Sequence, residues 1–276
     1  MGSFSAVELY LQDFHQRMAG ATSAAFATLG ARSAATQYTS SYAALAACIP
    51  DLAEPVTIMD LACGDGHLLK LLSDRQRPLR LIGVDMSQGE LDAARAVLPP
   101  NVTLLQERAQ ALSIETGSVD YVLSHMALML MDDIAQVLGE IRRVLRPQGT
   151  LAAIVGRTFL LGEVNDIFQS VFRPIAKEDA LSLSFGDRRT HTEAGWTELL
   201  APEFEQVQFT DIDVAWQPLP HELWHALTET YSIDLLSASA KERLRERLFQ
   251  ALAPLQKSDG TVRTGWGVRL IQAQAR

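Results

Sequence analysis

Between residues 56 and 156, short apolar runs alternate with segments whose apolar residues recur every three or four positions. The runs predict strands buried on both faces, and the intervening segments predict helices that cover a sheet. Because the connections are short, the alternation predicts a parallel, doubly wound α/β sheet. The expected strands are 56–62, 79–85, 101–107, 118–126 and 150–156, and the expected helices are 67–74, 87–98 and 132–149.

Outside this region the alternation is lost. The first fifty residues indicate helices with loop breaks at 18–23 and 30–41, and the C-terminal part indicates long strands at 204–216 and 264–275. Neither a repeat nor a low-complexity linker interrupts the chain, so we expect a single domain. Its expected parts are an N-terminal helical cap (1–50), a cofactor-binding core (51–157), a lid insertion (158–192) and C-terminal strands and helices (193–276).

Candidate chemistry begins at "MDLACGDGHLL", where Gly64 and Gly66 follow a predicted strand and precede a helix. Such a loop offers backbone amides to a nucleotide-like cofactor. A dinucleotide fingerprint has Gly or Ala three positions after the second glycine, whereas this chain has Leu69. Asp60 and Asp65 would also repel a pyrophosphate. S-adenosylmethionine has no phosphate, and a carboxylate at Asp60 would bind its ammonium group, so this cofactor is favoured over NAD or FAD.

The next predicted strand ends at Asp85, 21 residues after Gly64. An acid at this place can accept hydrogen bonds from both hydroxyls of a ribose. The alternative is that Asp85 caps the following helix. Met86 is expected to lie against the adenine as a soft apolar contact.

Taken together, these segments resemble the class I (Rossmann-like) S-adenosylmethionine-dependent methyltransferases over roughly residues 56–156. The likeness extends to "SVDYVLSHMALMLMDD" and to "EIRRVLRPQGTLAAI", in which Gln148 replaces a glycine. It implies a seven-stranded, mostly parallel sheet with helical lid insertions. The last strand would be antiparallel and inserted beside the fifth, with 204–216 and 264–275 as the sixth and seventh strands.

The resemblance also implies a set of cofactor-binding residues. After the third strand, the family often has an acid and then a small residue. Here Arg108 cannot accept a hydrogen bond from the adenine amino group, although the amide of Ala109 can serve, so either Glu107 takes the place of the acid or the contact is made by the backbone alone. Tyr38 and Tyr42 of the cap are candidates for closing over the methionine end, with helix packing as the alternative. The expected cofactor-binding residues are Asp60, Ala62, Gly64, Gly66, Asp85, Met86, Arg108, Ala109, Ser124 and Tyr38.

His125 is the candidate catalytic residue, because the resemblance places the end of the fourth strand opposite the transferable methyl group. An imidazole there can orient or deprotonate an oxygen or nitrogen nucleophile. A purely structural histidine is the equal alternative. The apolar segment 126–131 that follows suits a wall that excludes water, or ordinary packing.

Charge and cysteine content exclude several classes of protein. The formal charge of −9 weighs against nucleic-acid binding, which needs a cationic surface. The two cysteines form neither a metal-binding spacing nor a disulfide framework, which favours a reducing compartment and no metal. Without a signal sequence or a membrane-length apolar run, a soluble cytoplasmic protein is expected, as a monomer or a homodimer.

The sequence narrows the class of methyl acceptor mainly through the motifs that it lacks. No Asn/Asp-Pro-Pro-Tyr tetrad follows the fourth strand, which weighs against methylation of a nucleobase amino group. The additional segments resemble lids over a small pocket, so we expect a small-molecule acceptor, with a role in specialised metabolism. A protein methyltransferase and a non-catalytic cofactor-binding subunit are the alternatives. No tyrosine has a lysine four residues later, which argues against a short-chain dehydrogenase.

Overall fold

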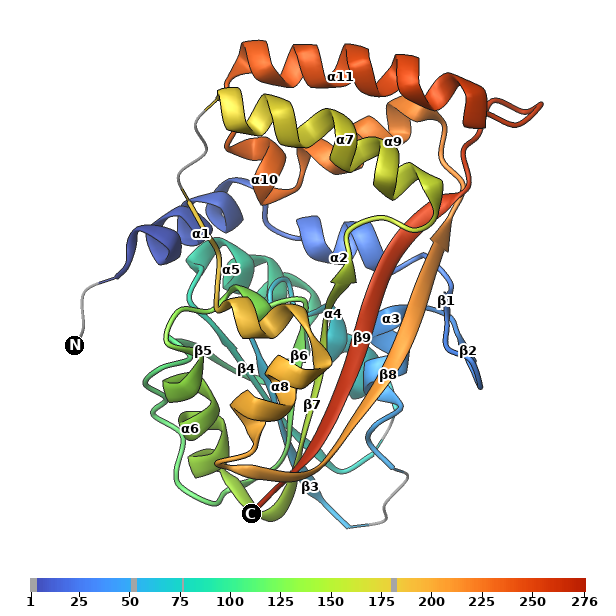
Figure 1. Cartoon of the computed structure of the whole chain (residues 1–276). Coiled ribbons are helices and arrows are strands. Elements are labelled where there is room, and N and C mark those ends of the chain that lie inside the picture. Colours follow the sequence, from blue (N-terminus) through green and yellow to red (C-terminus); the bar gives the residue numbers. More distant parts are fainter. Residues whose placement is uncertain (1–3, 51–53, 76, 180–182) are drawn as a thin grey trace.

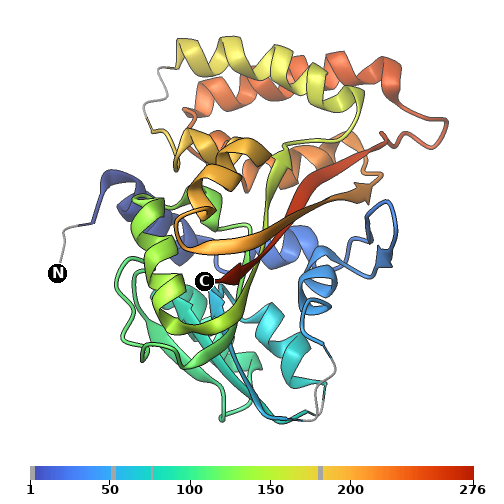
Figure 2. The same cartoon turned by 60° about the horizontal axis from the view of Figure 1, so that its bottom comes forward.

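A computed structural model describes residues 4–50, 54–75, 77–179 and 183–276. In these residues the chain forms one mixed sheet of nine strands, in the order β2-β1-β8-β9-β7-β6-β3-β4-β5 (Figure 1). Helices cover both faces of the sheet, and a further group of helices lies beyond one end of its strands (Figures 1 and 2). The predicted α/β class is therefore confirmed.

The five predicted core strands form the parallel half of the sheet. β3 is flanked by β4 on one side and by β6 on the other. The chain therefore builds the sheet outward from β3 first on one side and then on the other. Ligands of open α/β sheets bind at such a switch point, outside the carboxyl ends of the strands. The parallel strands are β3 (Val56–Leu61), β4 (Leu79–Asp85), β5 (Thr103–Gln106), β6 (Val119–His125) and β7 (Leu145–Thr158).

Alternate side chains of these strands enter two separate cores. Ile58 packs on one face with α3 (Ser41–Ala46), α4 (His67–Ser73) and α5 (Gln88–Val97). Met59, its neighbour, packs on the other face with two helices. Because successive strand residues point to opposite faces, the continuous apolar runs of the sequence are satisfied on both sides. The helices on the second face are α6 (Ile134–Val144) and α8 (Glu193–Leu200).

Two long strands complete the sheet as the resemblance implied. β9 (Thr264–Ala275) lies between β7 and β8 (Phe204–Trp216) and runs antiparallel to both. Both strands have the bounds expected from the sequence.

The strand count differs from the expected seven. The additional strands are β1 (Ala31–Arg32) and β2 (Gln37–Tyr38), which lie in the segment 30–41 that was expected to be a loop. β1 pairs antiparallel with the outer edge of β8, where Ala31 lies opposite Val214. Two-residue strands are too short to show a period, so only the pairing with β8 reveals them.

Helices beyond the carboxyl ends of the parallel strands cover the end of the sheet where a ligand is expected. α1 (Ala6–Arg17) and α2 (Ala21–Phe26) lie between the sheet and a second helical layer (Figure 1). That layer consists of α7 (Glu163–Glu178), α9 (Pro220–Thr228), α10 (Tyr231–Asp234) and α11 (Ala238–Leu252). Short 3-10 turns occur at 128–130, 188–191 and 253–255.

The expected lid insertion 158–192 contains α7, and its residues 180–182 lie outside the described part of the chain. No helix among the described residues is long and apolar enough to cross a membrane.

Candidate active site

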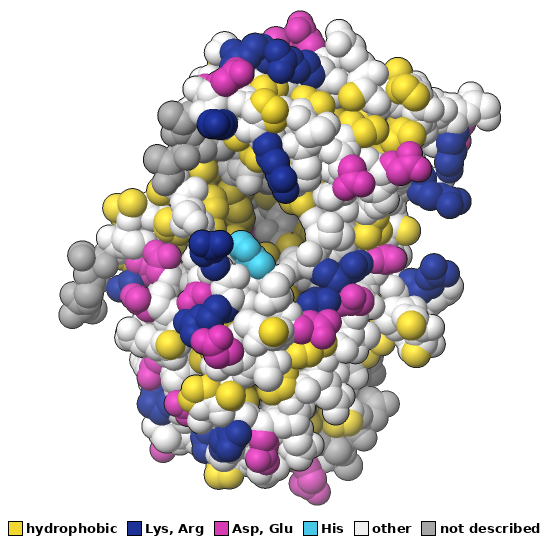
Figure 3. Space-filling view, viewed as in Figure 1, with side chains coloured by type: hydrophobic (Ala, Val, Ile, Leu, Met, Phe, Trp, Pro, Cys, Tyr) yellow, Lys and Arg dark blue, Asp and Glu magenta, His cyan; other side chains and the backbone are white. Residues whose placement is uncertain are grey.

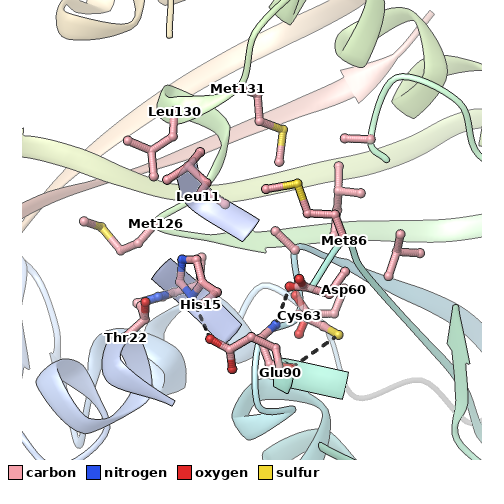
Figure 4. Close-up of a pocket in the computed structure, with 18 of the residues that line it drawn as sticks. Leu11, His15, Thr22, Asp60, Cys63, Met86, Glu90, Met126, Leu130 and Met131 are labelled. Atoms are coloured by element: carbon pink, nitrogen blue, oxygen red, sulfur yellow. Dashed lines mark hydrogen bonds and ion pairs between the residues drawn. The ribbon is translucent and has the colours of Figure 1, made fainter. Parts of the chain in front are cut away.

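A deep pocket opens at the carboxyl ends of β3, β4 and β6 and is roofed by α1 and α2. The space between its lining atoms is about 1020 Å³ when the open mouth is included. Figure 4 shows side chains from α1, α2 and the strand ends converging on it. The predicted residues among its lining are Asp60, Ala62, Gly64, Asp85, Met86, Arg108, Ala109 and His125.

The loop after β3 turns through three left-handed residues. Ala62, Gly64 and Gly66 have φ angles of 58°, 52° and 80°. Glycine adopts such angles readily, whereas Ala62 is an uncommon case that the surrounding contacts must hold in place. The amide of Gly64 donates to the Asp85 carboxylate at 2.9 Å, which ties the loop to the end of β4. The loop therefore presents its backbone to the pocket in one defined shape.

Gly66 has a packing role and lies outside the lining of the pocket, so its contact with the cofactor stays a prediction. A Cβ atom at this position would lie 2.8 Å from Leu98 Cδ1 and 3.1 Å from Ala94 Cβ. Both distances are shorter than ordinary contacts, so glycine is needed for α4 to start close against α5.

Asp85 occupies the position expected of a ribose ligand. Its Oδ1 accepts the amide of Ser87 at 2.8 Å, and its Oδ2 accepts that of Gly64. A carboxylate oxygen has two acceptor positions, so each still has one for a hydroxyl group. Burial raises the pKa of Asp85, although the bonds from Ser87 and Gly64 oppose this rise. The helix cap is instead the side chain of Ser87, which accepts from the amide of Glu90.

Asp60 is 2% exposed and is the most confined carboxyl group of the pocket loop. Burial raises its pKa well above the ordinary value, and the nearby Asp85 and Asp65 raise it further. A cation bound beside these acids would relieve the repulsion among them. The donor set therefore fits the sulfonium and ammonium groups of S-adenosylmethionine and opposes the pyrophosphate of a dinucleotide.

His125 is in the pocket wall, but its surroundings do not suit a base. Its Nε2 is 2.9 Å from the hydroxyl of Ser41, and its ring stacks on Tyr42 with centroids 3.8 Å apart. Its Nδ1 is buried and has no hydrogen-bond partner. Burial, with a smaller contribution from His67, lowers the pKa of His125 to about 3. The imidazole is therefore neutral, and it holds protons weakly.

Arg108 contacts the N-terminal helix. Its guanidinium donates to both carboxylate oxygens of Glu8 at 2.6 and 2.7 Å, and Gln110 donates to the same carboxylate. Glu8 also accepts the backbone amide of Ser5, which caps α1. The pair thus fastens the start of α1 over the pocket, a role that the sequence did not indicate.

Two other predicted residues lie outside the lining. Tyr38 is in the edge strand β2, and of the two candidate tyrosines of the cap only Tyr42 lines the pocket among the described residues. Ser124 is fully buried beside His125, and its hydroxyl has no hydrogen-bond partner. The sequence did not separate Tyr38 from Tyr42, because both lie in the same polar segment of the cap.

The pocket also contains residues that the sequence could not single out. His15 from α1 contacts both Glu90 of α5 and Tyr231 of α10. These partners are 75 and 216 residues away, so no local motif joins them. Apolar side chains of Leu11, Met126 and Leu130 lie on the same side of the pocket as His15 (Figure 4). Of the expected apolar segment 126–131, the residues that line the pocket are Met126, Ala127, Leu130 and Met131.

Within the described residues, no group of three or more His, Cys, Asp or Glu side chains is arranged to hold a metal ion.

Comparison with known proteins supports the resemblance. Residues 59–153 match the family described as "Methyltransferase domain". Over 105 residues the chain is 35% identical to malonyl-[acyl-carrier protein] O-methyltransferase of Methylovorus sp. (strain MP688). That alignment covers 35% of this chain and 36% of the relative, so the chain spans little more than a third of the relative's length.

Solved structures agree on the fold. The YcgJ protein from Bacillus subtilis matches 86% of this chain and 98% of its own, with a TM-score of 0.56 and 18% identity. Haemonchus contortus phosphoethanolamine N-methyltransferase 2, solved with phosphomonomethylethanolamine and S-adenosylhomocysteine, matches 85% of this chain and 52% of its own. Its TM-score is 0.51 and its identity 17%. These matches confirm the Rossmann-like fold that the resemblance implied.

Replacing Asp85 with alanine should weaken binding of S-adenosylhomocysteine by about 1.5–3 kcal/mol, the range for hydrogen bonds to a charged group. Isothermal titration calorimetry measures the change. Asp92→Ala, at an exposed position of α5, is the matched control and should bind normally. Thermal unfolding of both variants separates lost binding from lost folding. An unchanged affinity in folded Asp85→Ala would place the ribose elsewhere.

Acid should destabilise the protein partly through His125. A histidine of the unfolded chain takes up a proton near its ordinary pKa of 6.5, whereas folded His125 has a pKa of about 3. As the pH falls from 6.5 towards 3, the unfolded chain takes up a proton that folded His125 does not. The free energy of unfolding therefore decreases over this range. In His125→Gln this part of the acid sensitivity should disappear, as urea unfolding at about pH 7 and about pH 5 would show. His221→Gln, at an exposed position, is the control. Equal acid sensitivity in His125→Gln and the wild type would show that His125 is not held neutral.

Proposed function

We propose that this protein is an S-adenosylmethionine-dependent methyltransferase whose acceptor is a small, uncharged and largely apolar molecule. The observation that carries the proposal is one continuous pocket with two chemically different parts. Carboxylates and loop amides surround the end of β3, and an apolar wall lies against α1.

The first part would hold the cofactor. Asp85 would bind the ribose, and Met86 and the amide of Ala109 would contact the adenine; all three residues line the pocket. Asp60 and the amides around Gly64 would hold the methionine end. S-adenosylmethionine supplies a methyl group made electrophilic by its sulfonium sulfur. The protein itself orients the acceptor and excludes water, which are the main requirements for such a displacement.

The second part determines the acceptor class. Its wall of Leu11, Met126 and Leu130 suits an apolar body (Figure 4). Arg108 is the only arginine or lysine among the described lining residues, and its guanidinium is bonded to Glu8. An anionic acceptor would therefore meet mainly carboxylates, at a cost in electrostatic repulsion. This favours an uncharged acceptor.

A hollow in the surface of the protein also favours a small molecule. Figure 3 shows a hollow, with hydrophobic side chains on its walls, between the second helical layer and the sheet. The relatives do not define the acceptor, since one is named for malonyl-[acyl-carrier protein] and one was solved with phosphomonomethylethanolamine. The alternatives are a protein acceptor and a non-catalytic role. A role in specialised metabolism and a cytoplasmic location are further predictions from the sequence.

Calorimetry should show binding of S-adenosylmethionine and S-adenosylhomocysteine and none of NAD. Transfer from labelled S-adenosylmethionine should then be screened over matched pairs of apolar acceptors that carry the same hydroxyl or amino group, one member with a separate carboxylic acid and the other with that acid capped as an ester or amide. The uncharged member should be methylated at least about tenfold faster, because the carboxylate is repelled and poorly solvated in this pocket.

Binding of NAD in place of the sulfonium cofactor would refute the cofactor assignment. Faster transfer to the carboxylic acids would refute the acceptor class, and transfer only to a protein would replace it with the protein alternative. Cofactor binding without transfer to any acceptor would favour the non-catalytic alternative.

A further inference from the structure

A chain of three side chains crosses the pocket from α5 to α10. His15 Nδ1 is 2.7 Å from Glu90 Oε1, and His15 Nε2 is 2.8 Å from the hydroxyl oxygen of Tyr231. All three residues line the pocket. The arrangement couples a carboxylate, an imidazole and a phenol, as in sites that move protons.

Glu90 is fixed by its surroundings. Its side chain is 3% exposed, and its second oxygen accepts the amide of Gly20 at 3.0 Å. A buried carboxylate of this kind orients the imidazole and stabilises it once it is protonated. Glu90 accepts a hydrogen bond from the Nδ1–H group of His15. The Nε2 atom of neutral His15 therefore has no proton and accepts a hydrogen bond from the Tyr231 hydroxyl.

Tyr231 therefore donates to His15 and keeps its oxygen lone pairs for another donor. Its ring is held by Phe14 and Phe185, with centroids 4.8 and 5.5 Å away. Burial raises the pKa of Tyr231, so its hydroxyl is protonated at neutral pH. The hydroxyl can therefore take a proton from the methyl acceptor only if it gives its own proton to His15 at the same time.

The other histidine of the wall lacks these features. His125 contacts the Ser41 hydroxyl and the rings of Tyr42 and Phe26, and no carboxylate of the described residues bonds to it. A proton on His125 would be buried without a counter-charge. Geometry thus distinguishes the two histidines, although the sequence singled out His125.

We propose that His15, positioned by Glu90, takes up the proton that the acceptor loses during methylation, with Tyr231 as the relay. This inference rests on the proposed function. An acceptor oxygen or nitrogen uses a lone pair to form the new bond to carbon, and the pair of the broken carbon–sulfur bond stays on sulfur. The acceptor's proton passes to the Tyr231 oxygen as the Tyr231 proton passes to His15 Nε2. The product is an imidazolium paired with the Glu90 carboxylate, so atoms and charge balance.

The first test needs no acceptor. Protein labelled with ¹⁵N-histidine and bound to S-adenosylhomocysteine should show His15 protonated on Nδ1 and bare on Nε2, with a strongly deshielded Nδ1 proton. Glu90→Gln should remove that deshielding, while His221→Ala, at an exposed position of α9, should leave it unchanged. A proton on Nε2 and none on Nδ1 would overturn the inference, because such a tautomer cannot accept from Tyr231.

The second test uses turnover of the uncharged acceptor found in the matched-pair screen. His15→Asn keeps a donor towards Glu90 but cannot take up a proton, so kcat should fall by about 10²–10⁴-fold with little change in KM. Tyr231→Phe keeps the ring packing and should lower kcat by at least about tenfold. Both deficits should shrink at high pH, where the acceptor loses its proton unaided, and added imidazole should partly rescue His15→Ala.

A pH-independent deficit, or a wild-type kcat in His15→Asn, would overturn the relay and leave the methyltransferase proposal intact. Failure of the wild type to bind the cofactor, or to methylate any member of the screen, would instead overturn the proposed function and this inference with it.

Discussion

The repulsion among carboxylates buried around one pocket is the constraint on which the rest of the site depends. Asp60 and Glu90 are each 2% exposed, and Asp85 and Asp65 lie close enough to raise the pKa of Asp60. Such a group of acids is tolerated only where amides, histidine or a bound cation offset the charge. The loop amides at Gly64 and Ser87 and the ring of His15 supply part of that compensation. A sulfonium cofactor would supply the remainder.

The same acids fasten the roof of the pocket. Glu90 accepts the amide of Gly20 and bonds to His15, while Ser23 of α2 donates to Asp65. Gln12 of α1 donates to the carbonyl oxygen of Met86 at 3.2 Å. The roof of the pocket, α1 and α2, is therefore joined by hydrogen bonds to its floor, which Asp65, Met86 and Glu90 form at the strand ends. A ligand that neutralises the floor also changes the contacts that hold the roof.

Local sequence patterns were sufficient for the core and for the loop at its centre. The long strand β9 has the predicted bounds because its apolar residues face buried layers along its whole length. Asp60, Gly64 and Asp85 belong to motifs whose spacing is imposed by consecutive elements of the sheet, and all three line the pocket. Gly66 lies outside the lining, and a glycine needed for ligand approach and one needed for helix packing look alike in sequence.

Longer-range features could not be predicted. The roles of His15 and Arg108 depend on where α1 lies across the strand ends, which is decided by tertiary packing. The hairpin of β1 and β2 exists only because β8 offers a free edge. His125 was in the predicted place, yet the stacked Tyr42 and the absence of a bonded carboxylate among its described neighbours change its chemistry.

Amide hydrogen exchange of the whole protein, with and without S-adenosylhomocysteine, tests the central claim most directly. The account predicts that amides of α1, α2 and the loop 62–66 become protected together when the cofactor product binds, because floor and roof form one unit. Amides of α11, which is remote from the pocket lining, should change little. Protection of the loop without α1 and α2, or protection confined to another part of the molecule, would contradict it.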